Sequence, residues 1–230
     1  MVNWQEYWDK KAEKGDFDSM GRSGSSFKDL FIYVDSICRA FNDINRNDVV
    51  LDLGGGRGYI SMALSPFVKC IALTDFSNKM VEIALSETSV FDNIEVFRDG
   101  LPSIENIKLK LMEFSKIIVG SVIQYLDDYD AIERSFFNLF NVLKDGGKLL
   151  VTHNPDILKK DSFIESYNQL DWAKEKIATA INFEKNDRFW IEYNTLEKTA
   201  KSIGFSKCCK VAIPSSLFQS THMFDLLLIK

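Results

Sequence analysis

The chain has 230 residues, of which 46% are hydrophobic and 27% are charged, and its formal net charge at pH 7 is −5. This length predicts one globular domain with a full core. The net negative charge argues against a surface that binds the phosphates of a nucleic acid, so we expect no nucleic-acid partner. No apolar run reaches the roughly 18 residues of a membrane span, and the N-terminus has neither a basic start nor an apolar core, so we expect no membrane partner and no secretory signal.

Segment 1–26 is rich in aromatic side chains and ends in a stretch of serine and glycine. An aromatic arm followed by a flexible hinge suits a lid over a ligand, so we expect 1–26 to be an N-terminal arm or lid. Simple docking of these side chains onto the core is the alternative. The aromatic residues of the arm are Trp4, Tyr7, Trp8 and Phe17.

Helices and strands alternate from residue 27 to the end of the chain. Ser77 is a suitable N-cap, Asn194 and Glu197 form a capping-box pattern, and Gly146 with Gly147 is expected to end a helix. The predicted helices are 27–41, about 58–65, 77–86, 132–143 and 194–203. The predicted strands are 49–53, 68–73, 94–97, 116–120, 148–152, 208–213 and 224–229.

Continuous apolar strands between helices predict an α/β fold with a doubly wound, mostly parallel seven-stranded sheet and helices on both faces. The last strand is expected to differ. Only about ten residues, 214–223, join it to the strand before it, whereas a crossover between parallel strands usually needs a dozen or more residues. The last strand should therefore be antiparallel.

A glycine-rich segment follows the first strand directly. Asp52 precedes Gly54, Gly55, Gly56 and Gly58, which gives the spacing G-x-G-x-G after a buried strand. A dinucleotide fingerprint, G-x-G-x-x-G, would need glycine where Tyr59 stands, so that interpretation is weaker. The segment resembles motif I of the class I S-adenosylmethionine (SAM) dependent methyltransferases, h-D-h-G-x-G-x-G.

The resemblance extends to the ends of the next strands and implies SAM as the cofactor. It implies that the glycine turn lies against the methionine part and that Asp75 accepts hydrogen bonds from the ribose hydroxyls. Asp99, followed by Gly100, would accept from the adenine amino group. Phe76 could pack on the adenine face, and Ser121 could touch the methionine or adenine part. Arg22 could pair with the SAM carboxylate, although a solvated arginine is the alternative.

The Rossmann-like SAM-binding domain should consist of two parts, 27–154 and 194–230, with 155–193 as an insert between them. We expect this insert to form a wall of the methyl acceptor site, with a dimer interface as the alternative. Its apolar side chains fit one helical face: Phe163, Tyr167, Leu170, Ile177 and Ile181. Strand polarity places His153 and His222 on the ligand rim, and histidine suits the role of a base. Tyr125 is a third candidate for that role.

The predicted function is methyl transfer from SAM to a small molecule, such as a sugar or related metabolite. Oxygen is favoured over nitrogen as the acceptor atom. The Asn/Asp-Pro-Pro-Tyr motif that methylases of exocyclic base or amide nitrogens carry after the fourth strand is absent. The alternatives are a non-catalytic SAM-binding module and an aminopropyltransferase-like enzyme, for which Asp127 and Asp128 are the only hint. The four cysteines show no C-x-x-C or zinc pattern, so we expect no metal and a cytoplasmic location. The protein is expected to be a monomer or a homodimer.

Overall fold

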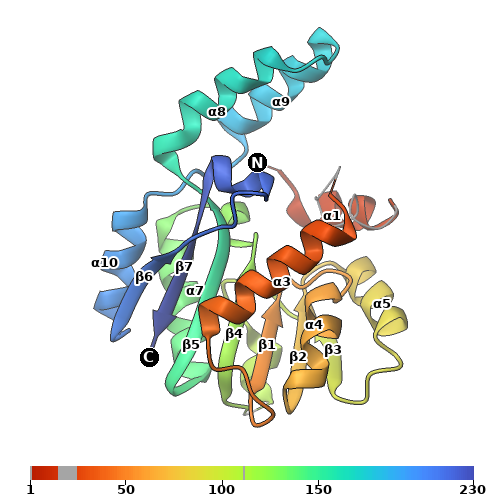
Figure 1. The fold of residues 1–230 in the computed structure, drawn as a ribbon, viewed down its shortest axis with the longest axis vertical. Coiled ribbons are helices and arrows are strands. Elements are labelled where there is room, and N and C mark those ends of the chain that lie inside the picture. Colours follow the sequence, from red (N-terminus) through yellow and green to blue (C-terminus); the bar gives the residue numbers. More distant parts are fainter. Residues whose placement is uncertain (1, 15–24, 111) are drawn as a thin grey trace.

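The computed structural model describes residues 2–14, 25–110 and 112–230 (Figure 1). Its centre is a seven-stranded sheet in the order β3-β2-β1-β4-β5-β7-β6. The strands are β1 (Val49–Leu53), β2 (Cys70–Asp75), β3 (Ile94–Arg98), β4 (Phe114–Gly120), β5 (Leu143–Pro155), β6 (Lys207–Val211) and β7 (Met223–Ile229). β1 to β5 pair in parallel, and β7 pairs antiparallel with both β5 and β6, which confirms the predicted fold class.

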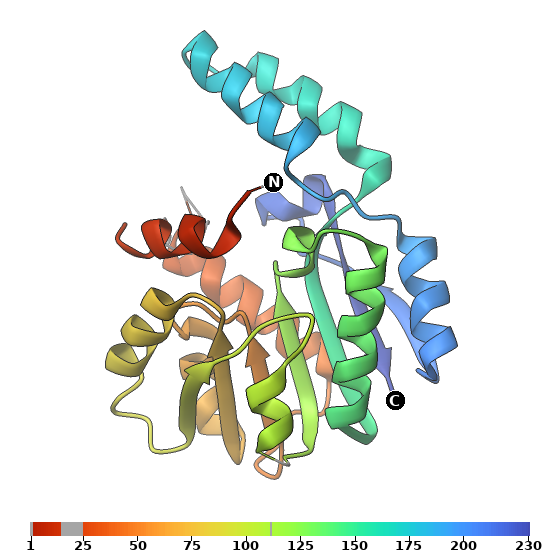
Figure 2. The ribbon, with the colours of Figure 1, turned by 180° about the vertical axis from the view of Figure 1, so that it is seen from behind.

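Helices cover both faces of the sheet (Figures 1 and 2). They are α1 (Trp4–Ala12), α3 (Phe27–Phe41), α4 (Tyr59–Leu64), α5 (Asn78–Glu87), α6 (Glu105–Leu109), α7 (Tyr129–Val142), α8 (Lys160–Ser166), α9 (Lys174–Asn186) and α10 (Tyr193–Ile203). One core cluster joins the sheet to α6, α7 and α10, and the other joins it to α3 and α4. Alternate side chains of β1 enter the two cores, so Leu51 and Leu53 face one and Val50 faces the other.

Two predicted helix-end signals are wrong. α10 begins at Tyr193 with Glu192 as its N-cap and no side-chain cap, so Asn194 lies inside the first turn and the capping box is wrong. α7 ends at Val142 and β5 follows at once. Gly146 does not end the helix: its N–H donates to the Lys230 carbonyl at 3.2 Å, so this segment pairs with the C-terminal end of the chain.

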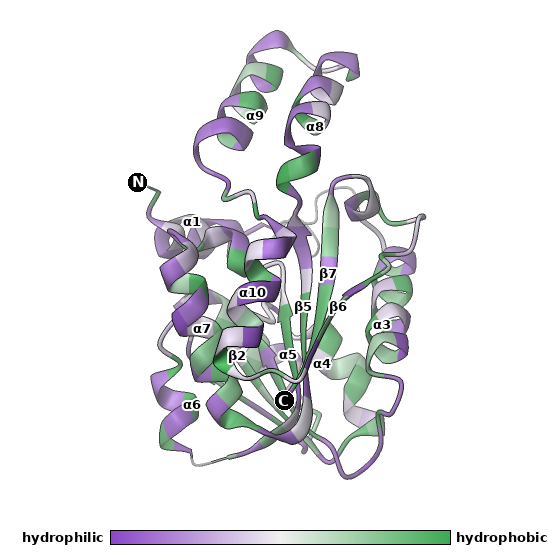
Figure 3. Cartoon of the chain, turned by 90° about the vertical axis from the view of Figure 1, so that its left-hand side faces the viewer, coloured by the Kyte–Doolittle hydropathy of each residue, from purple (hydrophilic) through white to green (hydrophobic). Residues whose placement is uncertain are grey.

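The insert forms a helical hairpin that extends beyond the sheet (Figure 3). Its chain leaves α8 through the 3₁₀ turn Tyr167–Gln169 and becomes extended at Leu170 before α9 begins. The predicted single helical face is therefore wrong, because Phe163 and Ile177 belong to different helices. None of the described helices is long and apolar enough to cross a membrane.

Candidate active site

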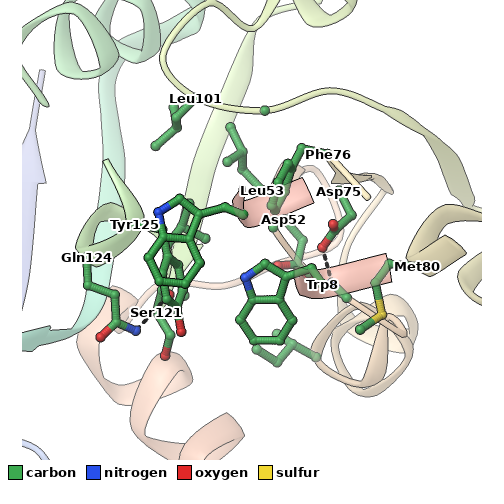
Figure 4. Close-up of a pocket in the computed structure, with 18 of the residues that line it drawn as sticks. Trp8, Asp52, Leu53, Asp75, Phe76, Met80, Leu101, Ser121, Gln124 and Tyr125 are labelled. Carbon is green, nitrogen blue, oxygen red and sulfur yellow. Dashed lines mark hydrogen bonds between the residues drawn. The ribbon is translucent and has the colours of Figure 1, made fainter. Parts of the chain in front are cut away.

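A cavity opens at the carboxyl ends of the central strands (Figure 4). Open parallel sheets bind ligands at this edge. Gly58 is the N-cap of α4 and does not line the cavity. Arg22 lies outside the described residues, so its pairing with the SAM carboxylate stays a prediction. The other residues predicted for the cofactor all line the cavity: Asp52, Gly54, Gly55, Gly56, Asp75, Phe76, Asp99, Gly100 and Ser121.

The glycine turn after β1 requires glycine for its backbone shape. Gly54, Gly56 and Gly58 have φ angles of 71°, 57° and 85°, in a backbone region that residues with a Cβ rarely adopt. The N–H groups of Gly54 and Gly55 both donate to the Thr74 carbonyl, at 2.8 and 3.0 Å, which fastens the turn to β2. A Cβ at Gly54 would lie 2.3 Å from Val122 Cγ2. The cradle can therefore hold a ligand against bare backbone.

Two buried carboxylates flank the glycine turn. Asp52 accepts a hydrogen bond from Ser61 Oγ at 2.7 Å. Asp75 accepts from the backbone N–H of Gly56 at 3.1 Å and of Ser77 at 2.9 Å. Burial raises the pKa of each carboxyl to about 6, and the neighbouring Asp52 adds to the rise at Asp75. Asp75 is thus a structural support of the turn as well as a cavity residue, which its position at a strand end alone did not indicate.

The end of β3 forms the next part of the wall. The Asp99 carboxylate accepts hydrogen bonds at 2.8 Å from the N–H groups of Gly100 and Ile107, so it orders the turn that leads into α6. A Cβ at Gly100 would lie 2.8 Å from Phe76 Cβ, so the absence of a side chain lets the Phe76 ring approach this turn. A planar aromatic ring and a fixed carboxylate therefore lie together at the β2–β3 end of the cavity.

Ser121, just after β4, joins the cavity to a buried polar group behind it. Its Oγ lies 3.2 Å from His153 Nδ1, and the His153 ring stacks on Tyr33 with centroids 4.4 Å apart. Ser121 and His153 both have positive φ, 61° and 57°. His153 is buried behind Ser121 and does not line the cavity, contrary to the expectation that it would face the ligand.

His222 also lies away from the cavity. Its ring stacks on Phe163 of α8 with centroids 3.8 Å apart, and its Nδ1 lies 2.9 Å from Thr221 Oγ1. Burial, helped by the positive charge of Arg188, lowers the pKa of His222 to about 3. At neutral pH this imidazole is therefore uncharged and a weak base. Its contacts are with the aromatic side chains of the insert, which indicates a packing role.

Helix α1 lies against the cavity, and a lid role for segment 1–26 stays a prediction. Trp4 and Trp8 line the cavity, and their rings lie 4.7 and 5.5 Å from the Tyr125 ring between centroids. Asp9 fastens the helix to the start of α5, because its Oδ1 accepts from Ser77 Oγ at 2.5 Å and from the Lys79 N–H at 3.3 Å. Tyr125 is the predicted base that does line the cavity.

Four further residues line the cavity, three polar and one methionine, and none of them belongs to a sequence motif. Gln124 precedes Tyr125 in the 3₁₀ turn Ile123–Tyr125, and its Nε2 donates to the Ser121 carbonyl at 3.0 Å. The other three come from the segment after α9, from the 3₁₀ turn before β7 and from the first residue of β7, far from the glycine turn in sequence. They are Arg188, Gln219 and Met223.

Comparison with known proteins identifies the family. Residues 44–200 match the sequence model of a methyltransferase domain. The chain belongs to the class I SAM-dependent methyltransferases. None of the curated protein sequences matches this methyltransferase.

Solved structures of methyltransferases share its fold at low sequence identity. The N-methyltransferase NodS from Bradyrhizobium japonicum WM9, bound to S-adenosylhomocysteine (SAH), is 11% identical with a TM-score of 0.66, over 100% of this chain and 99% of that one. Magnesium protoporphyrin IX methyltransferase from Synechocystis PCC 6803, with bound SAH, is 13% identical with a TM-score of 0.64, over 98% and 93%. Phosphoethanolamine N-methyltransferase 1 from Haemonchus contortus is 14% identical with a TM-score of 0.71, over 98% and 48%.

We expect Asp52→Asn to stabilise the ligand-free methyltransferase at neutral pH. The folded-state pKa of Asp52 is raised to about 6, so its stabilising contribution is present below pH 4 and is lost as the pH rises through 6. Asparagine stays neutral, so the difference in free energy of unfolding between variant and wild type should grow in favour of the variant by on the order of 3 kcal/mol between pH 4 and pH 7.5. Urea unfolding at both pH values measures it, and a constant difference would contradict the assignment.

Proposed function

We propose that this methyltransferase acts on a small-molecule acceptor and transfers the methyl group to oxygen. The observation that carries the proposal is a single cavity with chemically different ends, under the aromatic side chains of α1. The β2–β3 end holds the carboxylates and the Phe76 ring, and the opposite end holds Gln124, Tyr125 and Met223. SAM supplies a methyl group on a positively charged sulfur when it is bound.

The β2–β3 end suits the adenosine part of SAM. Asp75 is proposed to accept hydrogen bonds from the ribose hydroxyls and Asp99 from the adenine amino group, with Phe76 against the adenine ring. The glycine turn and Ser121 would then lie along the methionine part, and the sulfur would face the space beyond β4. Each carboxylate already accepts backbone N–H bonds, which hold it rigidly in place for further donors.

A small acceptor is supported by the covering helix. Trp4 and Trp8 close the cavity from above and pack on Tyr125, so a bulky polymer would have to displace α1. Two of the structural relatives are named for small acceptors, a magnesium porphyrin and phosphoethanolamine. The segment after β4, Gly120-Ser121-Val122-Ile123, lacks the Asn/Asp-Pro-Pro-Tyr motif of methylases that act on exocyclic base or amide nitrogens, which argues against those nitrogen acceptors.

Tyr125 is the residue that we propose to assist the acceptor proton. It lines the cavity, whereas His153 reaches the cavity only through Ser121, and His222 packs in the aromatic cluster beneath the insert. Because the chemistry is a direct displacement at carbon, holding the acceptor close to the sulfur in line with the methyl group accounts for most of the remaining catalysis.

The aminopropyltransferase alternative loses its only support. Asp128 is the N-cap of α7 and accepts from the Ala131 N–H at 2.7 Å, so its carboxylate serves the helix. Neither Asp127 nor Asp128 lines the cavity. The covering lid and the acceptor-side polar residues likewise favour an enzyme over a non-catalytic module.

Calorimetry with SAH and a labelled-SAM assay test the proposed function. We expect SAH to bind the wild-type protein in a single site, and we expect label to pass from SAM to one member of a panel of hydroxylated metabolites, carboxylic acids and phenols. Transfer to amines alone would contradict oxygen as the acceptor atom. Failure to bind SAH would contradict the proposed site altogether.

We expect Asp75→Ala to weaken SAH binding by about 1.5–3 kcal/mol, the range for hydrogen bonds to a charged group. Because Asp75 also holds the Gly56 and Ser77 N–H groups, alanine should lower the melting temperature as well. Asp75→Asn keeps the shape and one acceptor oxygen, so it separates the two effects and should retain more stability than alanine. Unchanged SAH affinity in both variants would remove Asp75 from the ribose role.

A further inference from the structure

Arg188 is a cavity residue whose charge has no part in the proposed cofactor site. It follows α9, and its side chain is 16% exposed. The Phe189 N–H donates to the Gln124 carbonyl at 3.3 Å, which fastens this segment to the turn after β4. In the sheet order, Asp75 and Asp99 lie at the ends of β2 and β3, on one side of β1, whereas the turn after β4 that holds the Arg188 segment lies on the other side of β1, toward β7.

The guanidinium is held in place by an ion pair with Glu184, while two of its nitrogens make no hydrogen bond to any residue that the structure describes. Its Nη1 lies 3.2 Å from Glu184 Oε2, but Nε and Nη1 have no hydrogen-bond partner among the described residues. Glu184 is itself positioned, since its Oε1 accepts from Tyr167 Oη at 3.2 Å and its carbonyl accepts from Trp190 Nε1 at 2.8 Å. Aromatic rings flank the cation, with Phe183 at 5.5 Å and Trp190 at 6.0 Å from Arg188 Cζ.

Buried donors of a charged group are costly when they stay unpaired, so such a group is normally matched by an acceptor. Arginine presents a planar fork of donors that fits the two oxygens of a carboxylate or phosphate. Gln124 adds a second unmatched polar atom to the same wall, since its buried Oε1 has no partner in the described part of the chain. An oxyanion with a nearby donor group would satisfy both side chains.

We propose that Arg188 binds an oxyanion of the methyl acceptor, so that the substrate class is a small acid that carries a carboxylate or a phosphate. The proposal rests on the proposed function, because it takes the β7 end of the cavity to be the acceptor site. Trp4, Trp8, Tyr125 and Met223 give the remainder of that end an apolar wall, so the group attached to the oxyanion should be aromatic or otherwise flat and apolar.

Matched probe ligands test the proposal on the SAH-saturated protein. Benzoate and phenyl phosphate carry the oxyanion, and benzamide is the neutral partner of benzoate. By calorimetry or ligand-observed NMR we expect at least one anion to bind about tenfold or more tightly than benzamide. The stronger of the two anions indicates whether the acceptor is a carboxylic acid or a phosphate ester.

Arg188→Gln should remove the preference for the anion, with a loss of anion affinity of about ten- to hundred-fold. Arg188→Lys should retain part of it, because the charge remains and the fork is lost. Arg46→Gln is the matched control: it makes the same change of charge at an exposed residue before β1, at the opposite edge of the sheet, and should behave as wild type. SAH affinity should be unchanged in all three variants.

Glu184→Gln provides a second variant that leaves Arg188 intact and removes its neighbouring negative charge. We expect it to bind the anion at least as tightly as wild type. A loss equal to that of Arg188→Gln would show that the pair only maintains the fold, and would overturn the proposal. An equal affinity of the wild type for benzoate, phenyl phosphate and benzamide would also overturn it. A fall in SAH affinity in Arg188→Gln would overturn it as well, because it would place Arg188 on the cofactor.

Wild-type protein that fails to bind SAH would instead contradict the proposed function.

Discussion

Replacement of Gly56 by valine is expected to abolish SAH binding, with a loss of affinity beyond a hundred-fold. Gly56 lines the cavity with a φ of 57°, and its N–H donates to Asp75 Oδ2 at 3.1 Å. A β-branched residue avoids this backbone region, so valine would twist the turn away from Asp75 as well as fill the cradle. Titration calorimetry with SAH at high protein concentration measures the loss.

Gly146→Val is the matched control for backbone strain. Gly146 has a φ of 72°, and a Cβ there meets nothing within 4 Å, so valine imposes a similar conformational penalty away from the cavity. Both variants should melt at a lower temperature than wild type, but only the Gly56 variant should lose SAH. Normal SAH affinity in a folded Gly56→Val protein would mean that the glycine turn does not hold the cofactor.

Tyr125→Phe is expected to reduce the rate of methyl transfer by about 10²–10⁴, the usual contribution of a general base, while SAH affinity stays near the wild-type value. Phenylalanine keeps the ring that packs on Trp4 and Trp8, so the cover over the cavity should remain. Single-turnover measurements with a saturating acceptor separate this effect from acceptor binding.

Tyr193→Phe removes a hydroxyl outside the cavity and serves as the control. Tyr193 begins α10 and packs on Phe224 with centroids 5.8 Å apart, so its loss should leave the rate unchanged. If Tyr125→Phe also left the rate unchanged, the transfer would depend on proximity and on an acceptor that is already ionised. An acceptor with a carboxylate oxygen would meet that condition without a base.

Strand ends and turn chemistry could be predicted from the sequence because both are local. The run Val49–Leu53 is the observed β1, and the glycines after it have the positive φ angles that the G-x-G-x-G spacing suggests. A parallel sheet brings its carboxyl ends to one edge, so Asp75 and Asp99 meet around one cavity. The antiparallel last strand followed from the shortness of its connection.

The direction of a side chain at that edge could not be predicted in the same way. His153 is at the expected edge, but the pairing of β5 with β7 shifts register between Val151 and Asn154, and His153 has a φ of 57°. This irregularity breaks the alternation of the strand and turns the imidazole onto Tyr33, behind Ser121. Strand polarity places a residue on the rim, whereas the local backbone decides what it faces.

By itself, the sequence determined the sheet, the glycine cradle and the acids that surround it, because short-range backbone preferences and strand polarity specify them. Only the tertiary structure decided which groups complete the other end of the cavity. Arg188 follows the helical hairpin of the insert, and no periodicity marks it, because a loop is placed by contacts with distant segments such as the Phe189–Gln124 hydrogen bond. Side chains that meet through such long-range contacts leave no spacing in the sequence that could reveal them.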